Sequence, residues 1–215
     1  VSITDRCNFK CVYCRTGNEG AQYAELSISD YLRIVRRFVS LGVEKVRLTG
    51  GEPLLRSGLI EMVGELAKMR TAYMPDGTQV FDTAQCRPLD IALTTNGHLL
   101  EELAQPLKDA GLNRITVSMD AVDAETFAKI TRVPRSFNLV LAGIRRAKAV
   151  GLGPVKVNCV LLRGFNDGQI EPFAEFSRRE GVIVRFIEFM PLEEDRSWKP
   201  ETVVRMNEIV TRLNA

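Results

Sequence analysis

The sequence predicts an α/β fold, specifically a partial (βα)6 barrel that is TIM-like but left open. Six β-prone runs alternate with helical patterns along the 215 residues, and such alternation predicts parallel strands joined by helices. A closed (βα)8 barrel usually needs eight strands and about 250 residues, so six units predict an incomplete one. Polar residues gather at the carboxyl ends of the predicted strands, which is where barrels of this kind carry their active sites.

The elements follow one another in a regular order. The β-prone run at residues 1–4 predicts the first strand. Ser27 or Ser29 can cap the first helix, whose apolar residues recur at helical spacing, and Gly42 ends it. We expect further strands at 43–49, 91–95, 114–118, 155–161 and 182–187. We expect further helices at 57–69, 99–110, 124–130, 138–150, 170–179 and 202–213.

Residues 70–89 interrupt this alternation. They show no helical or strand periodicity, and Pro75-Asp76-Gly77 is a strong turn signal. We therefore expect an irregular insertion, and neither it nor Cys86 receives a functional role.

Composition and charge narrow the class of protein. The chain has 29 Lys and Arg against 27 Asp and Glu, so no nucleic-acid partner is indicated. No apolar run approaches the ~20 residues that a membrane span needs, so no membrane partner is expected. Reduced cysteines without a targeting segment predict a cytoplasmic protein. Because the chain opens inside a predicted strand and without an initiator Met, we expect residues 1–215 to be one core domain of a longer protein.

Three cysteines, Cys7, Cys11 and Cys14, form a C-x3-C-x2-C motif directly after the first predicted strand. A cubane iron–sulfur cluster is normally held by four thiolates, so three would leave one iron open to a small molecule. A structural zinc site needs four Cys or His ligands, and the remaining candidates do not continue the motif. These candidates are Cys86, Cys159 and His98. The odd number of cysteines argues against a disulfide framework, and buried free thiols would explain one of the three but not this spacing.

The carboxyl ends of five predicted strands carry polar side chains that we expect to form one rim together with Cys7. They are Arg47, Thr49, Thr94, Thr95, Thr116, Ser118, Asp120, Lys156, Asn158, Arg185 and Glu188, the last two without an assigned face. Gly50-Gly51 follows the second strand and lets backbone groups approach a ligand closely. The adjacent Glu52 carboxylate can receive an ammonium group.

Several stretches, read together, resemble one family. They are Ser2-Ile3-Thr4-Asp5-Arg6-Cys7-Asn8, Val46-Arg47-Leu48-Thr49-Gly50-Gly51-Glu52-Pro53, Leu93-Thr94-Thr95-Asn96-Gly97, Val117-Ser118-Met119-Asp120, Val155-Lys156-Val157-Asn158 and Arg185-Phe186-Ile187-Glu188-Phe189-Met190-Pro191. The cysteine motif resembles that of the radical S-adenosylmethionine (SAM) superfamily. The whole set, which covers nearly the entire chain, is similar to the GTP 3′,8-cyclase family of molybdenum cofactor biosynthesis.

The resemblance implies a role for particular residues. Cys7, Cys11 and Cys14 would hold a [4Fe–4S] cluster whose fourth iron is chelated by SAM. Tyr13, Gly51, Ser118 and Met190 would contact SAM, and Arg47, Thr94 and Lys156 would contact GTP. Cleavage of SAM would give a 5′-deoxyadenosyl radical that abstracts the ribose 3′ hydrogen of GTP, leading to (8S)-3′,8-cyclo-7,8-dihydroguanosine 5′-triphosphate. The resemblance also implies an electron donor such as flavodoxin or ferredoxin and allows a homodimer.

Two features of the family are missing from this sequence. The family places an Arg that contacts GTP just before the first strand, and it carries a C-terminal region with three more cysteines for a second [4Fe–4S] cluster. We therefore expect residues 1–215 alone to bind a cluster and cleave SAM, with weak or no cyclase activity. Two alternatives stay open: another radical SAM enzyme, such as one that matures a peptide, and a non-enzymatic iron–sulfur electron carrier.

Overall fold

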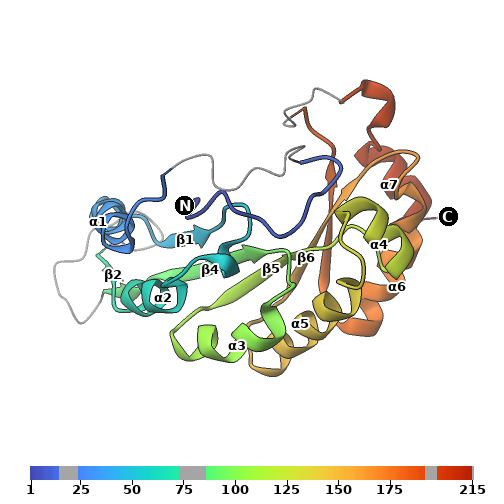
Figure 1. Cartoon of the computed structure of the whole chain (residues 1–215). Helices are drawn as coiled ribbons and strands as arrows, with labels where there is room; N and C mark the ends of the chain where they lie inside the picture. The colour runs from blue at the N-terminus through green and yellow to red at the C-terminus, as the bar shows by residue number, and fades with distance from the viewer. Residues whose placement is uncertain (15–23, 73–85, 192–197, 215) are drawn as a thin grey trace.

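A five-stranded parallel sheet forms the centre of the structure, a computed structural model that describes residues 1–14, 24–72, 86–191 and 198–214 (Figure 1). The strands lie in the order β1-β4-β5-β6-β7. Their bounds are β1 Lys45–Leu48, β4 Asp90–Thr95, β5 Arg114–Ser118, β6 Lys156–Leu161 and β7 Ile183–Glu188. The helices are α1 Ile28–Val39, α2 Leu59–Ala67, α3 Leu100–Asp109, α4 Ala124–Thr131, α5 Phe137–Ala149, α6 Ile170–Glu180 and α7 Met206–Leu213. Short 3₁₀ turns lie at Pro53–Leu55, Asp167–Gln169 and Pro200–Thr202. The predicted α/β fold is confirmed.

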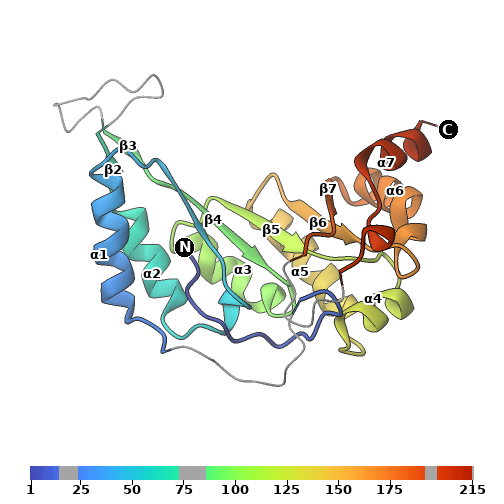
Figure 2. The same cartoon turned by 90° about the horizontal axis from the view of Figure 1, so that it is seen from above.

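The predicted first strand lies where expected but is only partly paired. Ser2 forms an isolated parallel bridge with Thr49, and the Ile3 amide donates to the Thr49 carbonyl at 2.9 Å. Beyond β1 the contact continues through the Gly51 amide, which donates to the Thr4 carbonyl at 2.9 Å. The N-terminal segment therefore acts as a sixth strand position at the β1 edge, and it then crosses the sheet toward α4 (Figure 2).

One face of the sheet is apolar and covered by helices. Helices α2, α3 and α5 lie against that face in Figure 1, and apolar strand residues beneath them are at most 1% exposed. Examples are Leu48, Ile91, Leu93, Ile115, Val117 and Val157. Burying each such side chain contributes about 1.5–3 kcal/mol, so this face stabilises the fold and leaves the other face to carry polar groups.

Helix boundaries follow local signals where such signals exist. Ser27 caps α1 by accepting from the Asp30 amide at 3.1 Å, as predicted. Gly58, at φ 79°, delays α2 to residue 59. The last predicted helix was placed too early, because Val203 bridges to Leu162 in an antiparallel pair and the chain stays extended until α7 begins.

The ends of the 70–89 insertion are not irregular, so that prediction was wrong there. Arg70–Thr71 (β2) and Arg87–Pro88 (β3) pair as a two-stranded antiparallel ribbon. The predicted Pro75-Asp76-Gly77 turn lies outside the described residues. The pairing joins positions that no short sequence window spans, which is why periodicity missed it.

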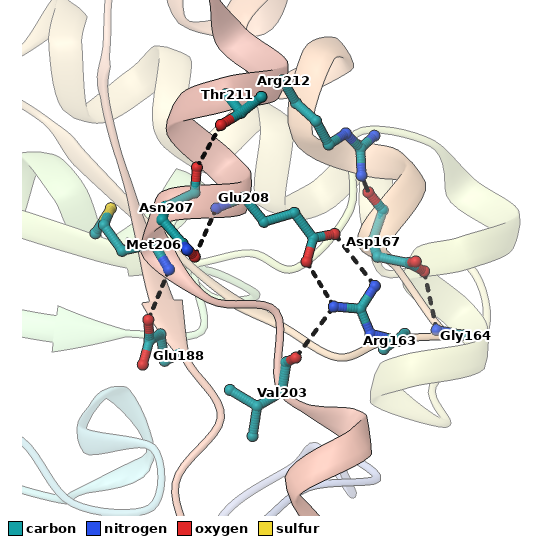
Figure 3. A network of polar contacts seen from close by, with 10 residues as sticks. All are labelled: Arg163, Gly164, Asp167, Glu188, Val203, Met206, Asn207, Glu208, Thr211 and Arg212. Carbon is teal, nitrogen blue, oxygen red and sulfur yellow. Dashed lines mark hydrogen bonds and ion pairs between the residues drawn. The ribbon is translucent and has the colours of Figure 1, made fainter.

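Helix α7 is fixed to the loop after β6 by polar contacts (Figure 3). Arg163 donates to both carboxylate oxygens of Glu208, at 3.1 and 2.6 Å. Glu188, which the sequence placed near the polar rim, accepts from the Met206 amide at 2.7 Å and so caps α7.

Within the described part of the chain, no helix is long and apolar enough to cross a membrane.

Candidate active site

The three motif cysteines line one cavity at the carboxyl ends of the strands. The cavity has a volume of about 270 Å³. The ends of four strands, the loops that follow them and the end of α4 also line it, at Thr49, Gly50, Gly51, Thr94, Thr95, Asn96, Ser118, Asp120, Thr131 and Val160. A second cavity of about 250 Å³ shares the cysteines and both glycines. Cys7 therefore lies in one cavity with five of the predicted rim residues, Thr49, Thr94, Thr95, Ser118 and Asp120. Glu188, by contrast, caps α7 instead of lining this cavity.

Aromatic packing anchors the start of the Cys loop, which we define as residues 7–14. The Phe9 ring meets Phe127 of α4 edge to face, with centroids 5.9 Å apart. It meets His98, the single histidine of the chain, in the same way at 5.8 Å. Such pairs add about 0.5–1.5 kcal/mol beyond area burial, so Phe9 fixes where the loop enters the sheet.

Backbone hydrogen bonds then attach the Cys loop to the end of α4. The Lys10 amide donates to the Thr131 carbonyl at 3.0 Å, and the Val12 amide donates to the Ile130 carbonyl at 2.9 Å. The last carbonyls of a helix have no partners within the helix, so the loop satisfies groups that α4 leaves open. These bonds hold Cys11, which lies between Lys10 and Val12, in place at the cavity.

Three cysteines on one cavity form a donor set that suits an iron–sulfur cluster. In the described segments, no group of three His, Cys, Asp or Glu side chains is placed to hold a single metal ion. Soft thiolate ligands select iron–sulfur clusters. Burial raises the pKa of the Cys7 thiol, and burial together with nearby Asp120 raises the pKa of Cys11 well above its usual value. In the absence of a bound metal, folding therefore favours the protonated form of both thiols.

The Glu52 carboxylate is not available to a ligand, contrary to the expectation that it could receive an ammonium group. Its side chain is 0% exposed. One oxygen accepts from the Leu54 amide at 2.9 Å and the Thr95 hydroxyl at 2.7 Å, and the other accepts from the Asn96 amide at 2.6 Å. Burial raises the pKa of Glu52 although these hydrogen bonds act in the opposite direction. The carboxylate instead joins the loop after β1 to the end of β4.

The predicted GTP residues lie in one row across the sheet. Thr94 pairs in register with Thr116, and Thr116 pairs with Lys156. Arg47 extends over this row from β1 and donates from Nη1 to the Thr94 hydroxyl at 3.0 Å and to the Thr116 hydroxyl at 3.2 Å. The structure thus brings Arg47, Thr94 and Lys156 onto one polar face and adds Thr116 to them.

A second row of paired residues lies two positions further along these strands, toward their carboxyl ends. Ser118 pairs in register with Asn158, and Asn158 pairs with Arg185. Arg185 Nε donates to Asn158 Oδ1 at 2.9 Å. This contact assigns Arg185 to the same face as Asn158, which the sequence left undecided because the apolar alternation fails in that strand.

Three of the four residues predicted for SAM line the cavity: Tyr13, Gly51 and Ser118. The Tyr13 hydroxyl donates to Asp120 Oδ2 at 2.6 Å, and its ring faces Phe189 with centroids 6.4 Å apart. Met190, the fourth, is 51% exposed and lines neither cavity, so its role stays a prediction.

Asn96, Thr131 and Val160 line the cavity but were not among the predicted site residues. Asn96 is 9% exposed, and its Nδ2 donates to Asn8 Oδ1 in the Cys loop at 2.7 Å. Its own Oδ1 accepts from the His98 amide at 3.0 Å. The available signal was an Asn directly after a predicted strand, since Asp120 and Glu188 were singled out just beyond the ends of their own predicted strands.

The chain is similar in sequence to known proteins. Residues 1–177 match the family model described as the radical SAM superfamily. The chain is 40% identical over 222 residues to a GTP 3′,8-cyclase of Acidothermus cellulolyticus, covering 100% of this chain and 57% of that protein. It is 41% identical over 218 residues to a GTP 3′,8-cyclase of Thermodesulfovibrio yellowstonii, covering 99% and 62%. The chain thus spans about three fifths of the length of these relatives.

Solved structures with the same fold are more distant in sequence. Streptococcus suis SuiB bound to S-adenosylmethionine superposes with a TM-score of 0.72 at 14% identity, covering 99% of this chain and 45% of SuiB. Methylornithine synthase (PylB) superposes with a TM-score of 0.71 at 16% identity, covering 100% and 60%. Both are evidence for the fold only. The superfamily uses SAM together with an iron–sulfur cluster, and the cysteine-lined cavity suits both. From its family match and this site, the chain belongs to the radical SAM superfamily.

Proposed function

We propose that the chain is the radical SAM core of a GTP 3′,8-cyclase, acting in molybdenum cofactor biosynthesis. The observation that carries the proposal is the row of Arg47, Thr94, Thr116 and Lys156, which meets the cysteine-lined cavity at Thr94. The chain that carries this row is about 40% identical to proteins of that name. The peptide-maturing alternative has support from the fold alone. Its example is SuiB, which has been solved bound to its precursor peptide SuiA and is 14% identical to this chain. An electron carrier would not need a row of cationic and hydroxyl side chains on this face of the sheet.

The cluster would be a [4Fe–4S] cubane held by Cys7, Cys11 and Cys14. Three thiolates leave the fourth iron open, and SAM would bind there. Tyr13, Gly51 and Ser118 would contact SAM from the walls of the shared cavity, and Met190 would reach it from the segment after β7. When bound, the cluster supplies the electron that cleaves SAM.

GTP would lie along the two polar rows. Arg47 offers a bidentate fork to phosphate and Lys156 a point charge, and Arg185 adds a third cation on the same face. The Thr94 hydroxyl, already a partner of Arg47, can bond a phosphate or ribose oxygen. The chain's contribution to catalysis would be to place the ribose of GTP beside SAM and to exclude water.

Some parts of this proposal concern the whole protein. The second [4Fe–4S] cluster would belong to a C-terminal region that follows the core domain in the family. An electron donor such as flavodoxin or ferredoxin would reduce the first cluster, and a homodimer is compatible with the resemblance. Reduced thiols suit the cytoplasm.

The cofactor part is tested by anaerobic reconstitution with iron and sulfide. We expect a four-iron cluster whose spectrum changes when SAM is added, and 5′-deoxyadenosine after reduction with dithionite. A cluster that cycles electrons while SAM remains intact would instead support the electron-carrier alternative.

The substrate part is tested by GTP binding, measured by equilibrium dialysis. Arg47→Ala should weaken binding roughly 10- to 100-fold, because a hydrogen bond to a charged group contributes about 1.5–3 kcal/mol. Arg36→Ala, on the exposed face of α1, serves as the matched control and should bind GTP like the wild type. Unchanged affinity in Arg47→Ala would remove the case for GTP.

A further inference from the structure

A buried carboxylate ties the second half of the Cys loop to the sheet. Tyr13 Oη donates to Asp120 Oδ2 at 2.6 Å, and Asp120 Oδ1 accepts from the Val160 amide at 2.8 Å. Asp120 is 3% exposed, so both bonds form away from water. Charge-assisted hydrogen bonds in such surroundings are short and strong. Asp120 therefore links Tyr13 to the ends of both β5 and β6.

Asp120 is itself held in place from behind. Asn166, which is 2% exposed, donates from Nδ2 to the Asp120 carbonyl at 2.8 Å and to the Val160 carbonyl at 2.8 Å. Its Oδ1 accepts from the Leu162 amide at 2.7 Å. The Asn166 side chain thus fixes the backbone at both strand ends, and the Val160 amide fixes the carboxylate itself.

The rest of the Cys loop shows why this link matters. Backbone bonds from Lys10 and Val12 fix the first half of the loop to α4. Tyr13 stands between Cys11 and Cys14, and a tight turn brings the Cys14 amide to the Cys11 carbonyl at 3.1 Å. The hydrogen bond to Asp120 therefore orients the turn that presents these two sulfurs to the cavity.

We propose that Asp120 is a positioning residue of the radical SAM site, which sets the orientation of Tyr13 and of the Cys11–Cys14 turn so that SAM can dock. The proposal rests on the proposed contact between Tyr13 and SAM. Asp120 acts through Tyr13, so its effect on SAM should vanish when the Tyr13 hydroxyl is absent.

The test uses three variants of the anaerobically reconstituted protein: Asp120→Asn, Tyr13→Phe and the double variant. SAM affinity is measured by equilibrium dialysis, and the change that SAM causes in the EPR spectrum of the reduced cluster is recorded. Each single variant should bind SAM about tenfold more weakly, with a smaller spectral change. The double variant should bind no more weakly than Tyr13→Phe, because residues that act through one contact are not additive. Iron content should match the wild type throughout.

Two matched controls isolate the effect. Tyr31→Phe removes a hydroxyl from α1, and Asp109→Asn changes an exposed carboxylate at the end of α3, away from the Cys loop. Both should bind SAM normally.

The outcomes separate the two assignments. Additive losses of SAM affinity in the double variant would overturn the role of Asp120 but not the SAM assignment. Wild-type SAM affinity in Tyr13→Phe would do the same. If Asp120→Asn fails to hold iron, Tyr13→Phe decides, because it leaves the bond between Asp120 and Val160 intact. A wild-type protein whose spectrum does not respond to SAM would overturn the SAM assignment as well, and loss of GTP binding would affect neither.

Discussion

At the scale of single residues, Glu52 shows how a buried carboxylate can serve the site without touching a ligand. It receives hydrogen bonds from the Leu54 amide, the Thr95 hydroxyl and the Asn96 amide. Asn96 in turn donates to Asn8 in the Cys loop. Glu52 therefore supports the cluster end of the cavity through a neighbour, and sequence alone could not tell which way a loop carboxylate turns.

We expect Glu52→Gln to destabilise the fold. The amide brings a donor toward backbone and hydroxyl donors whichever way it turns, leaving at least one buried group unpaired. The free energy of unfolding should fall by about 2 kcal/mol, measured by urea denaturation at neutral pH. Glu61→Gln, on the exposed side of α2, is the matched control and should change little. Equal stability of both variants would mean that the Glu52 bonds are replaced by water.

At the scale of elements, α4 is capped at its first turn and binds the Cys loop at its last turn, so the cap supports the loop through the helix. Asp123 caps the helix, accepting from the Thr126 amide at 2.8 Å and from Gln169 Nε2 at 2.8 Å. Burial acts to raise the pKa of Asp123, but the hydrogen bonds from Thr126 and Gln169 outweigh it, and the pKa lies below its usual 3.8. The ionised carboxylate is thus favoured in the folded state.

This cap predicts a stability difference that depends on pH. Asp123→Ala should lower the free energy of unfolding by about 1 kcal/mol at neutral pH. A carboxyl whose pKa is lowered by folding contributes stability above its unfolded-state pKa and loses it as the pH falls. The gap between wild type and Asp123→Ala should therefore narrow in an acid series of urea denaturation curves. Asp123→Asn should recover most of the loss at neutral pH, and a gap that widened with acid would contradict this account.

At the scale of the whole molecule, the sequence predicted what depends on nearby residues. The β5 strand lies at the predicted residues 114–118, and the β6 strand begins one residue later than expected at Lys156, because apolar runs between Gly and Pro signals are local. The start of α7 and the β2–β3 ribbon were missed, since both follow from pairing between distant segments. The rim residues were found because parallel strands end at one edge. Their hydrogen-bond partners were not, because orientation is set by packing.

Also at the scale of the whole molecule, Gly51 determines how closely the N-terminal segment packs over the sheet. A Cβ added to Gly51 would lie 2.3 Å from the Arg6 carbonyl oxygen and 2.8 Å from that of Asp5. These are backbone atoms, so a side chain there must push the segment outward. Gly51 is therefore needed first so that its loop can lie against the protein's own backbone at Asp5 and Arg6, just before Cys7.

We therefore expect Gly51→Ala to lose most of its bound iron after anaerobic reconstitution, because Cys7 moves away from the other two cysteines. Gly64→Ala in α2 is the matched control: its Cβ would meet nothing within 4 Å, and replacing Gly in a helix interior stabilises by about 1 kcal/mol. That variant should take up iron like the wild type and unfold at higher urea concentration. Iron is measured per chain, alongside circular dichroism to show that the sheet persists. A folded Gly51→Ala protein with a full cluster would show that Cys7 tolerates displacement, and would remove the N-terminal segment from the determinants of the site.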